Sequence, residues 1–256
     1  MATTRKNTAR STKRRTAFRV IATFLAVSAI AFGLFTLIFG IIDESQAIHA
    51  FHNVVVASLL LILSAPAAIA AARAPELSTR PLVHLTVVGI AGLLTMALGL
   101  TLDPFTLPVV VLVGVLWALR PSREGLIPPG RLSPILLVLL VAATVPLVGY
   151  ALGQAELQRI DKVSEHAEFF HWVETSFYAA AILLLALLAA LRPNDYRLSG
   201  WTAGVAFGVL GGGSLVLEGR PSAVDTPWAW AALAGSLVFL AMVEWESRRE
   251  TSRVPR

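Results

Sequence analysis

The sequence predicts an all-α protein: a polytopic transmembrane helical bundle of about eight spans with both termini in the cytoplasm. Composition is the first observation behind this class, because hydrophobic residues make up 56% of the 256-residue chain and charged residues only 14%, against about 25% charged in an average soluble domain. The second is that the apolar residues fall into long runs. The third is that the loops between these runs alternate between basic and acidic.

Eight apolar runs are long enough, or nearly so, to cross a hydrocarbon core about 30 Å thick. They cover residues 20–42, 54–72, 81–102, 105–119, 134–152, 169–191, 198–217 and 228–245. The fourth run is short, and Pro104 and Pro108 stand at its start, so the third and fourth runs are alternatively one span and a re-entrant piece. Uninterrupted apolar runs exclude a barrel and leave helices. The first run exceeds the apolar core of a signal peptide, and we expect it to be retained.

A single membrane domain is expected over residues 17–246. Residues 1–16 and 247–256 are polar and charged and contain no aromatic side chain, so we expect them to be disordered tails. Pro66 and Pro146 lie inside apolar runs and predict kinks. The five glycines in residues 204–213 indicate either close helix packing or an unwound segment at a binding site.

The basic residues predict the orientation of the chain. Of the 21 Lys and Arg residues, 18 fall in the two tails and in alternate loops, and only Arg159, Lys162 and Arg220 fall on the other side. The positive-inside rule therefore puts both termini in the cytoplasm. Next to a membrane span, the basic segment from Arg5 to Arg19 favours anionic lipid headgroups over nucleic acid as its partner. The composition suggests a bacterial protein of the plasma (inner) membrane.

Four of the five histidines fall at the predicted outer boundary. His49 and His52 lead the second span and share one helix face, while Glu168, His171 and Glu174 lead the sixth at intervals of three residues. Each polar face avoids lipid by facing the other. We therefore expect the second and sixth spans to touch at their outer ends, with the His52 and His171 side chains within about 10 Å.

Imidazole and carboxylate together suit a divalent transition metal: zinc, copper, iron or manganese. We predict that His49, His52, Glu168 and His171 bind the metal. Glu174 lies one to two turns inside the span, where an unpartnered carboxylate is costly, and is the predicted catalytic base. Haem held by two histidines is a weaker alternative. Two further interpretations are a proton relay through these side chains and plain solvated histidines.

These residues favour a metal-dependent site acting on a lipid-linked or periplasmic substrate. The alternatives are a proton-coupled carrier that uses Glu174 and His171, and a non-catalytic assembly or sensor subunit. Residues 62–72 and 179–191, the inner halves of the second and sixth spans, are nearly free of polar side chains, which argues against a carrier. The absence of cysteine excludes disulfides and thiolate metal sites. His84, near the inner end of the third span, is expected to be a hydrogen-bonded structural residue.

Overall fold

The computed structural model describes residues 2–121, 130–191 and 196–251, and within these ranges the chain is helical and contains no strand. The α-helices are α1 (Ala2–Ile42), α2 (Ala50–Ser58), α3 (Ala65–Arg73), α4 (Thr79–Gly99), α5 (Thr106–Leu119), α6 (Pro134–Ile160), α7 (Glu165–Glu168), α8 (His171–Ala190), α9 (Arg197–Val216) and α10 (Thr226–Thr251). Three further segments, η1 (Glu44–His49), η2 (Leu59–Ser64) and η3 (Pro75–Leu77), are a 3₁₀-helix, a π-helix and a 3₁₀-helix.

Six helical stretches of the described residues are long and apolar enough to cross a membrane. They are Thr12–Gly40, Ala47–Arg73, Thr79–Gly99, Pro134–Ile160, His171–Ala190 and Thr226–Arg249. The predicted all-helical class is therefore confirmed for the described residues, and six of their helical stretches are candidate membrane spans. Helix α5 is shorter than this set, with 14 residues, and the glycine-rich α9 does not belong to it. The crossings that we expect for α5 and α9 stay predictions.

The two terminal helices extend into the segments that we expected to be disordered. Helix α1 begins at Ala2, and α10 continues to Thr251. Residues 2–16 and 247–251 contain neither Gly nor Pro, the residues that most strongly end a helix, so nothing local stops either helix there. Residues 252–256 of the expected second tail lie outside the described residues.

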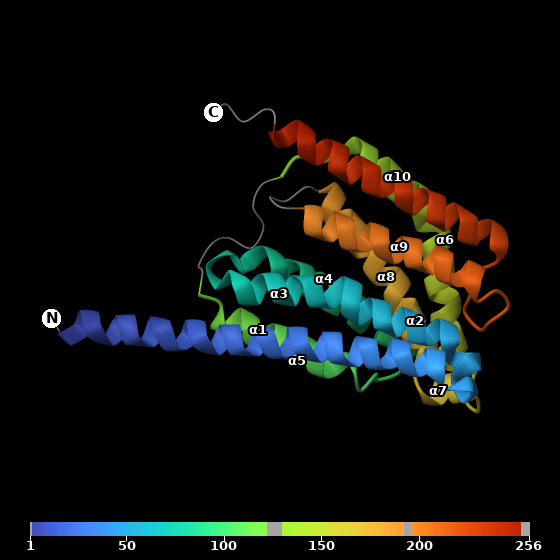
Figure 1. The fold of residues 1–256 in the computed structure, drawn as a ribbon, viewed down its shortest axis with the longest axis horizontal. Helices are drawn as coiled ribbons and strands as arrows, with labels where there is room; N and C mark the ends of the chain where they lie inside the picture. The colour runs from blue at the N-terminus through green and yellow to red at the C-terminus, as the bar shows by residue number, and fades with distance from the viewer. Residues whose placement is uncertain (1, 122–129, 192–195, 252–256) are drawn as a thin grey trace.

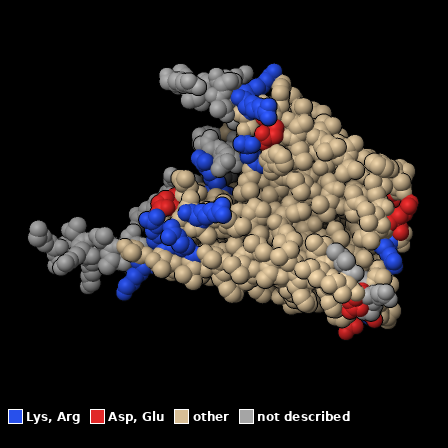
Figure 2. Space-filling model, viewed as in Figure 1, with Lys and Arg blue, Asp and Glu red and all other residues tan. Residues whose placement is uncertain are grey.

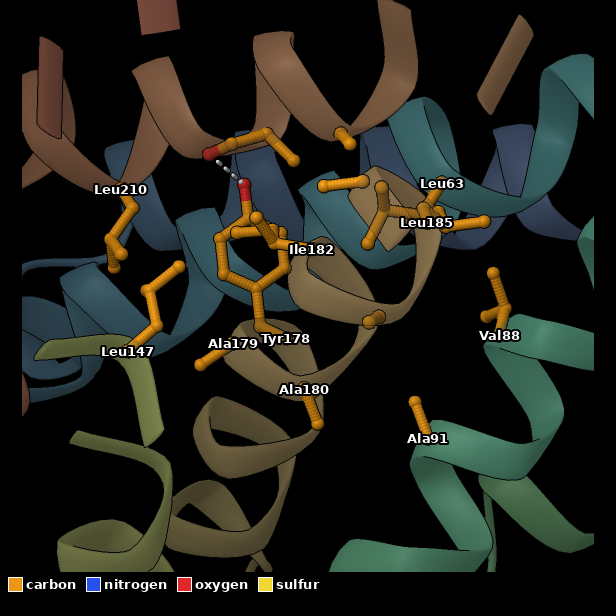
Figure 3. Close-up of a cluster of buried hydrophobic side chains, with 14 of the residues drawn as sticks. Leu63, Val88, Ala91, Leu147, Tyr178, Ala179, Ala180, Ile182, Leu185 and Leu210 are labelled. Carbon is orange, nitrogen blue, oxygen red and sulfur yellow. Dashed lines mark hydrogen bonds between the residues drawn. The ribbon is translucent and has the colours of Figure 1, made fainter. Parts of the chain in front are cut away.

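Helix α8 is the central helix of the bundle. It packs against α2, α4, α6 and α9, while α10 lies outside α9, and α1 runs along the other side of the molecule with α3 and α5 (Figure 1). Tyr178 of α8 is fully buried in the main apolar cluster, and its hydroxyl donates a 2.8 Å hydrogen bond to the carbonyl of Ala206 (Figure 3). Both chain ends lie at one end of the bundle, and α7 lies at the other (Figure 1).

The kink predicted at Pro66 takes the form of a π-helical turn. Segment η2 precedes this proline and joins α2 and α3 into one stretch. Proline has no N–H and collides with the carbonyl four residues earlier, and the wider turn relieves that collision. The carbonyl of Leu63, in this turn, accepts a 2.7 Å hydrogen bond from Nε2 of His84. Nδ1 of His84 accepts from Ser199 Oγ at 3.0 Å. His84 is thus the hydrogen-bonded structural residue that the sequence predicted.

The glycines of α9 serve close packing. A Cβ atom added to Gly211 would lie 2.5 Å from the carbonyl oxygen of Ala229, and one added to Gly204 would lie 2.6 Å from the side chain of Leu240. Ser236 of α10 donates a 2.7 Å hydrogen bond to the Gly204 carbonyl. Helix α9 remains continuous through these glycines. The packing interpretation is therefore correct, and the unwound segment is not found.

The surface has an apolar belt and two charged ends. Large apolar side chains on the outside of α1, α6 and α10 are exposed, among them Phe24, Val138 and Trp230. An exposed apolar surface of this kind belongs in lipid. Lys and Arg gather at the end that carries the termini, whereas Asp and Glu gather mainly at the other end (Figure 2). The molecule therefore has the end-to-end charge difference that the loops predicted.

Candidate metal centre

Four histidines meet at the end of the bundle where α2, α7 and α8 converge. His49 is the last residue of η1, His52 lies in the first turn of α2, His166 is on α7, and His171 opens α8. The first three are buried, and His171 is nearly so. This end of the bundle is the acidic end, on the right of Figure 2.

An interruption of the helix between α7 and α8 makes this convergence possible. Phe170 has a φ of 64° and adopts the left-handed conformation, which costs a non-glycine residue roughly 1–2 kcal/mol. Its carbonyl accepts from the amide of Glu174, and α8 begins at His171. Residues 165–168 and residues 171–190 therefore belong to two separate helices, and the apolar run predicted at 169–191 does not continue the helix before it. The break turns His166 inward and leaves Glu168 exposed.

The imidazole rings are in mutual contact. His52 and His171 stack with centroids 4.8 Å apart and an interplanar angle of 19°. The His49 ring lies 4.8 Å from His171 and 4.6 Å from His166, and His166 lies 4.8 Å from His52. The predicted contact between the second and sixth spans is confirmed, since His52 belongs to α2 and His171 to α8.

Hydrogen bonds at the back of the rings define the tautomers of His49 and His52. Nε2 of His49 lies 3.2 Å from a carboxylate oxygen of Glu165, which can only accept when ionised, so Nε2 carries the proton. Ser222 Oγ donates to Gln154 at 2.7 Å and therefore accepts the Nε2 proton of His52, 2.9 Å away. The Nδ1 atoms of both rings are buried without a hydrogen-bond partner. Each ring is thus left with a buried lone pair.

His166 presents its other nitrogen in the same way. Its Nε2 is buried without a partner, and the ring hydrogen-bonds the backbone of Ile48. Burial lowers the pKa of His166, and the nearby rings of His49 and His171 lower it further. The ring is therefore neutral at pH 7, as a metal ligand must be.

His171 is oriented by the acid that the sequence singled out. Its Nδ1 lies 3.2 Å from Oε2 of Glu174, one turn further along α8. Glu174 is buried, so the imidazole supplies the partner that a carboxylate at this depth requires. The predicted base is thus in direct contact with a predicted ligand.

The donor set fits a transition-metal ion. One ring nitrogen from each of His49, His52 and His166 lies within 4.8 Å of the others. Metal–nitrogen distances are about 2.0–2.1 Å for zinc, so small ring movements bring three such nitrogens onto one ion. Carboxylate, hydroxyl and carbonyl partners behind the rings are the outer contacts that metal-binding histidines ordinarily have. His171 is adjacent and available as a fourth ligand.

A second group of side chains supports the histidines from behind. The Trp172 ring stacks on His166 with centroids 4.9 Å apart, and its Nε1 donates to Asp161 at 3.1 Å. Asp161 also accepts from the hydroxyl and amide of Ser164 and from the amide of Val163, and these bonds hold the pKa of its carboxyl below the usual range. The loop before α7 is thereby fixed to the start of α8.

Of the four predicted ligands, His49 and His52 belong to the group that could hold a metal ion, and its third member is His166. His171 packs against the rings of His49 and His52, whereas Glu168 is exposed on α7. His166 was missed because it lies five residues before His171, which is off phase in a continuous helix. Its nearness in the sequence to His171, at the same predicted membrane boundary as His49 and His52, was the available signal.

Comparison of the chain with family models, with curated proteins and with solved structures gives no match, so the case for a function comes from the site alone.

Proposed function

We propose that this chain is a multi-pass plasma-membrane protein that binds a divalent transition-metal ion at its outer end and uses it on a membrane-associated substrate. The observation that carries the proposal is the arrangement of three buried histidines. Each has one ring nitrogen hydrogen-bonded and the other buried without a partner, and one nitrogen of each ring lies within 4.8 Å of the other two. A buried polar atom without a partner costs free energy, and a metal ion would offset that cost at all three nitrogens.

The proposed orientation places the termini in the cytoplasm, with α5 and α9 crossing as well. The basic end of the molecule, which carries both termini, supports it (Figure 2). The histidines lie at the opposite end and therefore at the outer face in this orientation.

An all-imidazole donor set narrows the choice of metal. Imidazole suits zinc, copper, iron and nickel, whereas manganese prefers carboxylate and water. Three histidines with a fourth position for water or substrate are the usual arrangement of catalytic zinc. Haem is disfavoured because His52 and His171 stack face to face, whereas axial ligands approach an iron from opposite sides of the macrocycle.

A bound divalent ion would polarise a substrate oxygen or lower the pKa of a coordinated water. Glu174 would hold the His171 ring in place through Nδ1, beside the three histidines that bind the ion. A carrier is less favoured, because α8 has no polar side chain from Ala179 to its end at Ala190. The proposed activity is therefore a metal-dependent reaction at the outer surface rather than transport.

The test is metal analysis of the detergent-purified protein after growth with zinc, copper and iron. We expect about one ion per chain, and we expect His52→Ala and His166→Ala to lose it while circular dichroism stays helical. Glu168→Gln is the matched control, because this exposed acid lies outside the proposed ligand set and should keep the ion. A metal-free wild type, or histidine variants with full metal content, would overturn the proposal.

A further inference from the structure

An apolar cavity reaches Glu174, the acid that lies 3.2 Å from His171 of the histidine cluster. Its volume is about 290 Å³, it is lined by residues of α1, α2, η2, α4, α5 and α8, and exposed side chains such as Phe24 and Phe32 leave it open to the outside of the bundle. Along α1 it extends from Phe32 to Phe24, eight residues, or roughly 12 Å of helix. Phe24 is the deeper of the two, because α1 ends near the histidines at Ile42. The cavity therefore runs along the bilayer normal, as a hydrocarbon chain does.

The two ends of this cavity differ in polarity. Phe24, Leu60, Val109 and Leu112 are among the apolar side chains that form its walls, whereas two buried acids, Asp103 and Glu174, line its outer end. The carboxylate of Asp103 already has hydrogen-bond partners, because its oxygens accept from the amides of Phe105 and Thr106. Glu174 is the acid that hydrogen-bonds His171. A molecule whose head group reaches Glu174 is therefore next to the histidine cluster.

We propose that this cavity holds the hydrocarbon chain of the substrate, a single-chain lipid whose uncharged head group donates a hydrogen bond to Glu174. The inference rests on the proposed metal site and names the substrate class for it. A long-chain alcohol or amide has the required head group. A carboxylate or phosphate head is disfavoured, because two acids and no Lys or Arg line the described walls of the cavity.

The larger groove of the described residues is a poorer candidate for the same role. It has a volume of about 510 Å³ and lies between α6, α8, α9 and α10. Neither groove is lined by a clustered histidine, but Glu174, the acid next to His171, lines the smaller cavity and not this one. Membrane lipid can fill it without reaching the site.

The probe for the test is hexadecanol with a diazirine in its chain, photolysed with the protein in nanodiscs. We expect saturable labelling of cavity residues in the wild type. Ser28→Phe fills the cavity and should lower that labelling roughly tenfold, the effect of about 1.4 kcal/mol. Val27→Phe is the matched control: it adds the same group one residue earlier, where the side chain is 58% exposed, and should leave labelling unchanged.

Competition defines the head group and separates the two proposals. Unlabelled hexadecanol should displace the probe, and hexadecyl phosphate at equal concentration should not. Equal labelling of Ser28→Phe and Val27→Phe, or labelling that never saturates, would overturn the cavity assignment. Metal content is measured on the same samples. A metal-loaded protein without saturable labelling overturns only this inference, whereas a labelled protein that never binds metal overturns the proposed function.

Discussion

At the residue scale, the site depends on what stands behind each imidazole. Glu165 is largely exposed, yet it accepts from Nε2 of the buried His49 at 3.2 Å. Partners of this kind fix the tautomer and the ring orientation, and their loss usually weakens metal binding 10- to 100-fold. Exposure of the carboxylate places this effect at the lower end of that range.

We therefore expect Glu165→Gln to weaken metal binding by roughly tenfold without abolishing it. Glutamine keeps an acceptor oxygen but loses the charge that strengthens the bond to His49. Titration against a competing chelator measures the change. Glu168→Gln, three residues away on the same short helix, should show wild-type affinity. An equal loss in both variants would contradict the role of Glu165 as the partner of His49.

The hydrogen bonds of Asp161 predict how the stability of the protein depends on pH. Its pKa is lowered in the folded protein, mainly by the hydrogen bonds from Ser164 and Trp172. The ionised form therefore adds stability above the unfolded pKa of about 3.9, and this stability is lost as the pH falls toward the lower folded value. Asp161→Asn should melt below the wild type at pH 6, and the gap should narrow below about pH 4. Thermal unfolding in detergent across this range measures it, and a gap that widens on acidification would refute it.

Much of the site could be predicted from the sequence at this scale. His49, His52 and His171 follow from spacing and depth, because a helix fixes which residues share a face. The inward position of His166 and the exposure of Glu168 could not be predicted, because both depend on the left-handed Phe170 that precedes α8. A non-glycine residue in that conformation has no sequence signature.

At the scale of elements, α9 and α10 are held together by glycines that differ in their surroundings. A Cβ at Gly211 would lie 2.5 Å from the backbone oxygen of Ala229, whereas one at Gly212 would meet nothing within 4 Å. The sequence predicted packing through these glycines without showing which ones make it. Helical phase alone does not reveal which face α10 covers.

We expect Gly211→Ala to destabilise the protein by about 1–3 kcal/mol, because the backbone of α10 must move to admit the methyl group. Gly212→Ala should be neutral or stabilising by up to about 1 kcal/mol, since alanine favours the helix and finds open space. Thermal melting of the two variants in the same detergent compares them. A more harmful Gly212→Ala would show that α9 is rotated about its axis, away from the orientation in which Gly211 faces α10.

At the scale of the whole molecule, the charged side chains and the apolar helices both fit a bundle with two different ends. Cations gather at the end with the termini, and acids gather mainly at the end with the histidines (Figure 2). Apolar runs predicted the bundle and most of its long helices, because length and hydropathy are enough to define a span. The short fourth run, which forms α5, was already set apart by its length, whereas the glycine-rich run that forms α9 was counted as an ordinary span and is not among the clear candidates.

Cysteine labelling tests the proposed orientation, and the cysteine-free chain gives a clean background. Leu77→Cys lies at the basic end with 58% of the native side chain exposed, and Val163→Cys lies at the acidic end with 97% exposed. A membrane-impermeant maleimide on whole cells should label Cys at 163 only, and Cys at 77 should react after lysis. Labelling of position 77 on intact cells would invert the orientation and move the histidine site to the cytoplasm.

The π-helical turn at Leu59–Ser64 has a consequence for the register of the whole span. It acts as a one-residue insertion, which shifts everything on one side by about 100° of helical phase relative to the other, at 3.6 residues per turn. The half that carries His52 and the half that carries Ala67 and Ala71 are therefore oriented independently. Removing one residue from this turn would rotate the two halves relative to each other, so they could not both keep their present neighbours. Either His52 would turn away from α8, or Ala67 and Ala71 would turn away from α1.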